Sequence, residues 1–311
     1  MGALSVCVVG GGHWGLALAA AIGRAGNRAL IVTRRAELTL PEGCELAELA
    51  RACDEARLVI FAVPSRAARE AARQLGDHLG GHHYVVHGVR GLVGDGLETV
   101  SEVLRQETPA RRVGALGGPV LEPDLLAGAP SVMVTGARFP EVNELLAEAF
   151  TSPALRLYST HDLRGLEWAS ALVGCVAIAA GYARGLGVNA GLVAAFMTRS
   201  IHEAARIAVA AGGEDRTLLG LAGYGDLLAA VLEDERPEIA LGRALAGGKT
   251  AADALAEARH SVEAVELVPR ILAWCEQREL RTPIFRALGL GILGGHPPDT
   301  LLHQLMTMPH V

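Results

Sequence analysis

Seven short apolar runs recur along the first 155 or so residues, each bounded by Gly, Pro, Ser or charged residues. They read SVCVVG, ALIVT, LVIFAV, YVVHGV, RVGAL, SVMVT and LRLYS, starting at residues 5, 29, 58, 84, 112, 131 and 155. Residues 14–26, 65–75 and 96–107, which lie between them, have apolar residues at helical spacing. Strands that alternate with helices build a largely parallel sheet with helices on both faces. We therefore expect an α/β, Rossmann-type doubly wound domain.

From about residue 160 onward the sequence contains no convincing strand. Long Ala/Leu-rich helical patterns follow instead, interrupted at GLGVN (185–189), AAGGEDRT (210–217), GLAGYGD (220–226) and GGKT (247–250). A chain of 311 residues is long for one core and suits two. The expected domains are a dinucleotide-binding domain over 1–158 and an all-helical substrate or dimerisation domain over 159–311.

Composition excludes several classes of protein. Half of the residues are apolar and 20% are charged, which is globular. The net charge of −6 leaves no basic face for nucleic acid. The N-terminus runs into LSVCVVGGG without a signal peptide, and the five cysteines form no CxxC pair, so we expect a cytoplasmic protein with reduced thiols. Lys249 is the only lysine among 28 basic residues, which fits a GC-rich genome.

The segment LEWASALVGCVAIAAGYA, residues 166–183, has one charge, Glu167. A membrane span needs about 20 apolar residues, and this segment is shorter and rich in Ala and Gly. We therefore expect no membrane span here, but a helix buried within the helical domain.

The first predicted strand ends in GGGHWG, so Gly10, Gly12 and Gly15 form GxGxxG between a strand and a helix. The three glycines allow a tight turn, close approach of a pyrophosphate, and close packing of helix on strand. The N-terminus of the helix adds amide donors and a positive dipole end. The sequence predicts a dinucleotide site rather than a purely structural turn.

Two arginines follow the second predicted strand. An NAD-specific site places Asp or Glu there to bind the ribose hydroxyls, whereas this chain has Arg34 and Arg35. Guanidinium groups suit a 2′-phosphate, so NADP(H) is favoured over NAD(H) as the cofactor. A solvated arginine pair in an arginine-rich chain is the alternative.

Nine motifs in chain order indicate a family. They are GGGHWGLALA, FAVPS, GVRGL, GGP, GCVAIAAGYARGLGVN, MTRSIHEA, TLLGLAGYGDL, SVEAV and TPIF. Over about 275 residues they resemble the bacterial glycerol-3-phosphate dehydrogenases, which interconvert dihydroxyacetone phosphate and sn-glycerol 3-phosphate with NAD(P)H. The resemblance implies a Rossmann-type domain, a helical domain, a substrate between them, and a homodimer. It also places a set of residues at the cofactor: His13, Trp14, Pro64, Arg90, Glu122 and Glu263.

The catalytic positions depart from the family pattern. Hydride reduction of a ketone leaves a developing alkoxide that needs a proton and positive charge. In the family these come from the lysine of an ALKN motif, and here that motif is ALVG, with Val173 and Gly174. A second family lysine is Arg90, which keeps a charge but holds its proton too tightly to donate it.

The phosphate-binding positions have changed as well. The family carries Arg-Asn some eleven residues after the GDL aspartate, and a count without gaps from Asp226 places Pro237 and Glu238 there. A carboxylate repels a phosphate, and Arg236 could replace the family arginine only if the loop shifted by one residue. The family Ser or Thr after Gly118 and its proline is Val120.

The acid that survives is Asp226, which in the family faces the catalytic lysine and the substrate. Its alternative role is to cap the helix that follows. Asn189, Arg199 and Glu203 survive on the same helical side.

Four histidines, His78, His82, His83 and His87, lie in DHLGGHHYVVH. A solvated loop before a strand explains the first three better than a metal site. His87 is at the carboxyl end of a predicted strand, where doubly wound folds bind ligands. It is the candidate replacement acid, and a partly buried strand histidine is the alternative.

Two classes of function follow. The first is an oxidoreductase-like member of this family with an altered, non-phosphorylated substrate or little activity. The second is a pseudoenzyme that binds NADP(H) and acts as a regulatory or interaction module.

Overall fold

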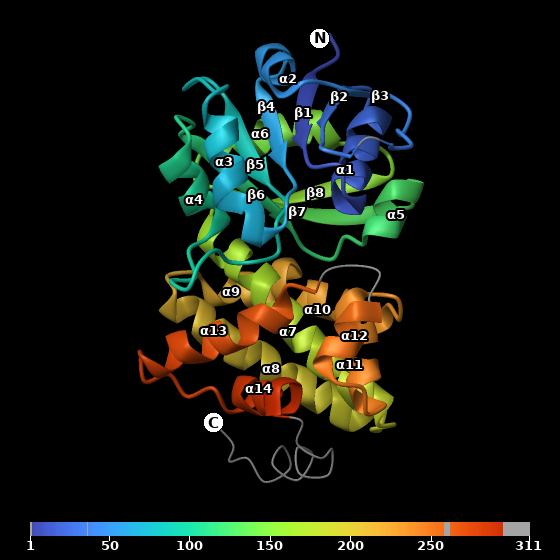
Figure 1. Cartoon of the computed structure of the whole chain (residues 1–311), viewed down its shortest axis with the longest axis vertical. Coiled ribbons are helices and arrows are strands. Elements are labelled where there is room, and N and C mark those ends of the chain that lie inside the picture. The colour runs from blue at the N-terminus through green and yellow to red at the C-terminus, as the bar shows by residue number, and fades with distance from the viewer. Residues whose placement is uncertain (1, 36, 258–261, 295–311) are drawn as a thin grey trace. The chain divides into compact units, whose positions relative to one another are not determined.

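The computed structural model describes residues 2–35, 37–257 and 262–294, and Figure 1 labels its helices and strands. The chain divides into two compact units. The first contains residues up to Gly94 and then Glu98–Glu167, and the second contains Asp95–Leu97 and the residues from Trp168 onward. This division at Glu167 and Trp168 lies later in the chain than the boundary expected after residue 158.

The first unit is built on one sheet of eight strands in the order β3-β2-β1-β4-β5-β6-β7-β8. The strands are β1 (Ser5–Val9), β2 (Arg28–Val32), β3 (Cys44–Leu46), β4 (Leu58–Phe61), β5 (Tyr84–His87), β6 (Arg112–Gly117), β7 (Ser131–Ala137) and β8 (Leu155–Thr160). Only β6 and β7 pair antiparallel among the described strands. The chain leaves β1 toward β2 on one side and returns to β4 on the other, so the order reverses between β1 and β4. Doubly wound folds bind ligands at such a reversal, beyond the carboxyl ends of the strands.

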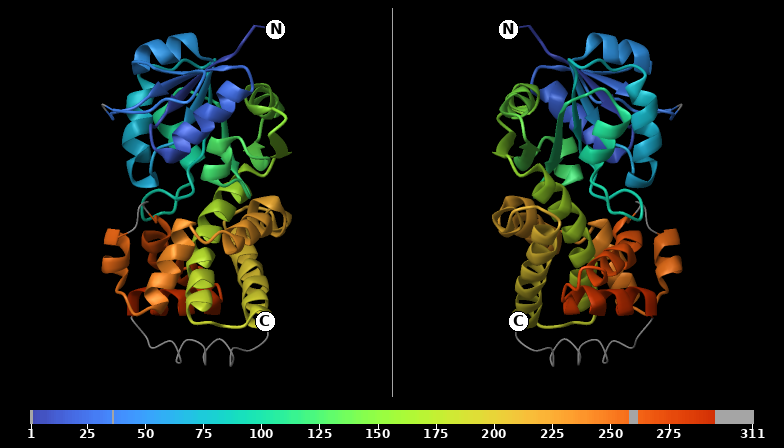
Figure 2. Two further views of the ribbon diagram at one scale, coloured as in Figure 1. Left: turned by 90° about the vertical axis from the view of Figure 1, so that its right-hand side faces the viewer. Right: turned by 90° about the vertical axis from the view of Figure 1, so that its left-hand side faces the viewer.

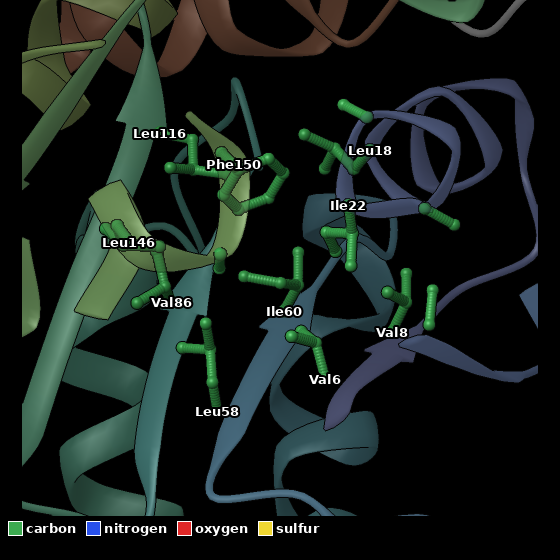
Figure 3. Packing of buried hydrophobic residues seen from close by; sticks show 14 of the residues in the cluster. Val6, Val8, Leu18, Ile22, Leu58, Ile60, Val86, Leu116, Leu146 and Phe150 are labelled. Carbon is green, nitrogen blue, oxygen red and sulfur yellow. The ribbon is translucent and has the colours of Figure 1, made fainter. Parts of the chain in front are cut away.

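Helices cover both faces of this sheet, as the α/β prediction required (Figure 2). One face packs against α1 (His13–Arg24), α5 (Glu122–Ala127) and α6 (Pro140–Phe150), and Figure 3 shows part of this layer, with Leu18 and Ile22 of α1 above Val6 and Ile60. The other face packs against α2 (Leu49–Glu55), α3 (Ala68–Gly76) and α4 (Val100–Glu107). Because side chains alternate along a strand, Val6 and Val8 enter the first layer and Cys7 enters the second.

The second unit is helical throughout its described residues. It contains most of α7 (Leu163–Gly185), then α8 (Ala190–Ala210), α9 (Asp215–Leu219), α10 (Asp226–Leu232), α11 (Pro237–Ala246), α12 (Ala251–Glu257), α13 (Ala264–Glu276) and α14 (Pro283–Gly294). The breaks expected at GLGVN, AAGGEDRT and GGKT separate these helices. GLAGYGD forms η2 (Leu221–Gly225), one turn of π-helix closed by the bond from Gly225 N–H to Gly220 O at 3.0 Å.

Helix α7 is the one described helix that is long and apolar enough to cross a membrane. Its most apolar window is 83% buried inside the protein. A membrane-spanning helix presents apolar side chains to lipid, whereas α7 presents them to its neighbours, as the core helix of a globular unit does.

Candidate functional site

The turn between β1 and α1 has the backbone geometry of a dinucleotide-binding loop. Gly10 has φ +127°, and a Cβ there would lie 2.2 Å from the carbonyl oxygen of Ala62. A Cβ on Gly15 would lie 1.9 Å from the carbonyl oxygen of Gly10. Neither position accepts a side chain, so the close packing of turn, helix and neighbouring strand depends on both glycines.

Gly12 differs from these two glycines because a Cβ there would meet nothing within 4 Å. It is the N-cap of α1, which has no side-chain cap and no acidic residue in its first turn. The N-terminal amides of α1 therefore face open space without a competing carboxylate. Such a helix end binds a phosphate through its N–H groups and its dipole, so these residues fit the pyrophosphate of a dinucleotide.

His13 and Trp14 begin helix α1 next to this space. His13 is exposed and Trp14 is half-buried. The indole nitrogen of Trp14 lies 2.5 Å from the position of a Cβ on Gly88, so the indole fits only because residue 88 is glycine. This buried N–H has no acceptor among the described residues.

Arg34 and Arg35 follow β2 and are both exposed. No carboxylate forms an ion pair with either guanidinium among the described residues, while Arg28 on the same strand pairs with Glu45 and Glu55. The two arginines are thus able to bind an anion at the edge of the sheet where the ribose of a dinucleotide lies in Rossmann folds.

The other expected cofactor residues are distributed over both units. Pro64 is exposed after β4, Arg90 is half-buried three positions after the end of β5, and Glu122 is the half-buried first residue of α5. Glu263 belongs to the second unit, where it is the N-cap of α13. Their contact with a cofactor stays a prediction.

His87 ends β5 and is 1% exposed. The backbone N–H of Val89 donates to its Nδ1 at 3.3 Å, so the ring proton is on Nε2, which lies 2.9 Å from Oε1 of Glu167. Glu167 also accepts from the N–H and hydroxyl of Ser101 at 2.8 and 2.7 Å. The single charge of the apolar segment is therefore satisfied inside the first unit, and the one N–H of His87 is directed to it.

Gly118 and Val120 lie just after β6. Gly118 has φ +87°, and a Cβ there would lie 2.7 Å from Cγ2 of Val134, which explains the glycine. Val120 is 2% exposed and belongs to the apolar core of the first unit. The expectation that Val120 contacts substrate is wrong for its side chain, because an apolar group buried in this core has no free face.

Helix α7 carries Val173 and Gly174 at the positions of the family Lys-Asn pair. Val173 is 0% exposed. A Cβ on Gly174 would lie 3.7 Å from Oε1 of Glu238 and 3.7 Å from the Cβ of Ala264. The absence of a side chain at Gly174 leaves the space into which the Glu238 carboxylate points, so these two changes fit each other sterically.

A buried ion-paired cluster, Asp226–Arg236–Glu238, lies next to these positions in the second unit. Nη1 of Arg236 donates to Oδ1 of Asp226 at 2.9 Å and to its backbone oxygen at 3.3 Å. Nε of Arg236 donates to Oε2 of Glu238 at 3.2 Å. The side chains are 0%, 6% and 15% exposed for Asp226, Arg236 and Glu238.

Two backbone features hold this cluster. Asp226 is the first residue of α10, immediately after the π-turn η2, and π-turns are frequent at functional sites. Arg236 is the N-cap of α11, and Pro237 opens that helix because its missing N–H and fixed φ suit the first turn. The N-cap of α10 is Gly225, without a side-chain cap, so the alternative role of Asp226 as a helix cap is wrong.

The charge of Arg236 is used within the cluster. Burial by itself lowers the pKa of the Arg236 guanidinium, but the nearby Asp226 and Glu238 carboxylates outweigh it and raise the pKa above its ordinary value. The guanidinium therefore stays charged. Its Nη2 atom is buried and has no acceptor among the described residues, and an unsatisfied buried donor costs about 1–3 kcal/mol, or more when it is charged.

The remaining predicted residues of the helical side hold helices in place. Asn189 is the exposed N-cap of α8, and its side chain accepts from the N–H of Leu192 at 3.0 Å. Glu203 is 1% exposed and accepts from the N–H groups of Ile284 and Phe285 in the first turn of α14. Arg199, on the same helix as Glu203, is half-buried.

No group of three or more residues that could hold a metal ion occurs in the described part of the chain. His83 is 3% exposed, and its Nε2 lies 3.0 Å from the backbone oxygen of Cys53, while its Nδ1 accepts from the N–H of Gly80 at 2.8 Å. It therefore fixes the turn before β5.

Two family models match this chain. NAD-dependent glycerol-3-phosphate dehydrogenase N-terminus matches residues 36–142, and NAD-dependent glycerol-3-phosphate dehydrogenase C-terminus matches residues 162–303. Residues 258–261 and 295–303 of the second match, and Ser261 of the SVEAV motif, lie outside the described residues.

Full-length relatives agree with these models. The chain is 31% identical over 322 residues to glycerol-3-phosphate dehydrogenase [NAD(P)+] of Rhizobium etli, with 98% of each chain covered. It is 32% identical to the same enzyme of Nitrosococcus oceani, covering 97% of this chain and 93% of that one. The crystal structure of glycerol-3-phosphate dehydrogenase from Coxiella burnetii has the same fold, with a TM-score of 0.91, 21% identity, and coverage of 98% and 99%. The chain therefore belongs to the NAD-dependent glycerol-3-phosphate dehydrogenase family.

Proposed function

We propose that the protein binds NADP(H) as an oxidoreductase-like member of this family, and that its substrate is not phosphorylated or its activity is low. The curated relatives are named for the oxidation of glycerol 3-phosphate with NAD(P)+. The observation that carries the proposal is the Asp226–Arg236–Glu238 cluster beside a wholly buried Val173. A cation that must offset two carboxylates has little attraction left for a phosphate.

The cofactor half supports NADP(H). The amides at the N-terminus of α1 would hold the pyrophosphate, and the exposed Arg34 and Arg35 would bind a 2′-phosphate. The nicotinamide would supply the hydride when bound. Trp14, the one tryptophan in the first unit, begins α1 and gives a fluorescence signal for cofactor binding.

The test is steady-state oxidation of NADPH in the presence of dihydroxyacetone phosphate. We expect no turnover above the rate without substrate, because the position of the proton-donating lysine is an apolar core residue. A positioned general acid contributes about 10²–10⁴-fold. Robust turnover would overturn the proposal and would direct attention to Arg90 and His87 as sources of charge or of a proton.

The alternative function is a pseudoenzyme that binds NADP(H) and regulates a partner. The environment of His87 favours it, because the N–H of this histidine is directed to the buried Glu167 carboxylate. To donate a proton to a substrate, His87 would have to break this bond. NADPH binding without turnover on any carbonyl compound would support this alternative.

A homodimer and a cytoplasmic location are also proposed. The five cysteines are all free thiols, as in a reducing compartment. Four exposed leucines on α9, η2 and α10 provide apolar surface for a second copy: Leu219, Leu221, Leu228 and Leu232. Light scattering on the purified protein gives the mass, and a monomer at all concentrations would contradict the dimer.

A further inference from the structure

The Asp226–Arg236–Glu238 cluster carries hydrogen-bonding capacity that its own ion pairs do not use. Nη2 of Arg236 is a buried charged donor without an acceptor among the described residues. Oε2 of Glu238 accepts from Arg236, whereas no hydrogen bond to Oε1 of Glu238 is found among the described residues. A donor and an acceptor are thus left on two side chains that are bonded to each other.

We propose that Arg236 has taken over the place of the absent lysine as the cation beside Asp226, and that this cluster binds an uncharged α-hydroxy carbonyl compound or vicinal diol. Nη2 of Arg236 donates to the carbonyl or hydroxyl oxygen of this ligand, and Oε1 of Glu238 accepts from its adjacent hydroxyl. This inference names the substrate class for the proposed function and rests on it for the reaction, but the binding stands independently of turnover.

The charge of the cluster selects against phosphate esters. Two carboxylates and one guanidinium leave one net negative charge, and all three side chains are at most 15% exposed. Water screens buried charges weakly, so a phosphate dianion is repelled there. An uncharged oxygen ligand is not repelled, and it relieves the unsatisfied donor.

Glycine at position 174 makes this arrangement possible. The Oε1 atom of Glu238 points toward Gly174 at ordinary contact distance from the position of a Cβ. An asparagine side chain there would extend into the same space. Gly174 and Glu238 therefore act as specificity-determining residues together with Arg236.

The test compares dihydroxyacetone with dihydroxyacetone phosphate by ligand-observed NMR, on the whole protein with NADPH present. We expect dihydroxyacetone to bind at least about tenfold more tightly. Arg236→Lys keeps the charge but removes the Nη2 donor, and we expect it to weaken dihydroxyacetone binding by about 10- to 100-fold, the range of one hydrogen bond to a charged group. The matched control is Arg243→Lys on the same helix, where the guanidinium is 50% exposed and pairs with Asp234. We expect no change from it.

Glu238→Gln is the second variant, in case Arg236→Lys does not fold. It retains an acceptor oxygen and the side-chain size but removes a negative charge. We expect it to strengthen binding of dihydroxyacetone phosphate by about tenfold, the effect of one nearby charge in a partly buried site, and to leave dihydroxyacetone binding nearly unchanged. A thermal melt of each variant establishes that it is folded.

Several results overturn the proposal. They are equal binding of the two compounds, no binding of dihydroxyacetone at its highest soluble concentration, and unchanged binding in a folded Arg236→Lys variant. Arg236-dependent binding of dihydroxyacetone without NADPH oxidation would support the ligand assignment while contradicting the oxidoreductase part of the proposed function.

Discussion

The turn at Gly10–Gly15 and the Asp226–Arg236–Glu238 cluster treat charge in opposite ways. The turn offers backbone amides to open space, with no acidic residue in the first turn of α1 and with exposed arginines nearby. The cluster surrounds its one guanidinium with two buried carboxylates. The turn is ready for an anion, and the cluster has already neutralised its cation.

This difference follows from how each region is built. The nucleotide-binding turn depends on backbone geometry, and its glycines also pack against Ala62 and Gly10, so their loss would disturb the fold as well as the cofactor. The substrate-binding positions are side chains at helix ends, and a set of such side chains can be exchanged together without altering the helices. The family fold can therefore persist while its phosphate chemistry is lost.

The largest effect is expected from restoring the family residues in the second unit. The quadruple variant Val173→Lys, Gly174→Asn, Pro237→Arg and Glu238→Asn should reduce dihydroxyacetone phosphate about 10²–10⁴-fold faster than any of the single variants, the contribution of a positioned general acid. Val173→Lys alone should stay inactive, because its ammonium enters a position that is 0% exposed without an asparagine neighbour. Initial rates of NADPH oxidation measure this.

A single variant as active as the quadruple variant would show that one residue, and not a concerted exchange, separates this chain from its relatives. Melting curves identify variants that fail because they do not fold.

A smaller effect is expected at the edge of the first unit. NADPH should bind about tenfold more tightly than NADH, since each charge-assisted hydrogen bond to the 2′-phosphate contributes about 1.5–3 kcal/mol before solvent screening reduces it. Arg34→Glu should reverse this order, and Arg66→Glu, on the exposed surface after β4, is the charge-matched control. Titration of protein fluorescence gives both affinities. Equal affinities in the unmutated protein would remove the argument for NADP(H).

The smallest effect concerns Glu203, which supports α14. Burial raises the pKa of Glu203, partly offset by the N–H groups of Phe285 and Ile284 and by the charges of Arg206 and Arg199, and Cys275 also lies nearby. At pH values between the ordinary and the raised pKa, the folded state holds a proton that the unfolded state has lost. The free energy of unfolding should therefore fall as pH rises through this interval.

Urea denaturation at several pH values tests this on Glu203→Gln, which should lack this component of the pH dependence. Glu276→Gln, at an exposed position on α13, is the control. A constant difference between the unmutated protein and Glu203→Gln across the pH range would contradict the prediction.

The sequence predicted the sheet well because strands buried on both faces are continuous apolar runs. All seven predicted runs are strands, whereas β3 was missed because its three residues are only partly buried. The antiparallel pairing of β6 and β7 was not predicted, because an apolar run does not reveal the direction of its neighbour. Helices α2, α5 and α6 were also missed, and the first two are only seven and six residues long.

The partners of buried charges were beyond the reach of the sequence. Glu167 was recognised as an isolated charge, but its partners Ser101 and His87 are 66 and 80 residues away. Arg236 was set aside because a count without gaps placed it one residue from the phosphate position. Its bond to Asp226, ten residues earlier, exists only because the loop after α10 folds back on that helix.

Ligand-induced stabilisation of the unmutated protein tests the contrast between the two regions most directly. A ligand at a hundred times its dissociation constant stabilises a protein by about 2.7 kcal/mol. NADPH should therefore raise the melting temperature clearly, and millimolar dihydroxyacetone phosphate should leave it unchanged with or without NADPH. A clear upward shift with dihydroxyacetone phosphate would mean that Arg236 leaves Asp226 and Glu238 to bind phosphate, and it would contradict the account.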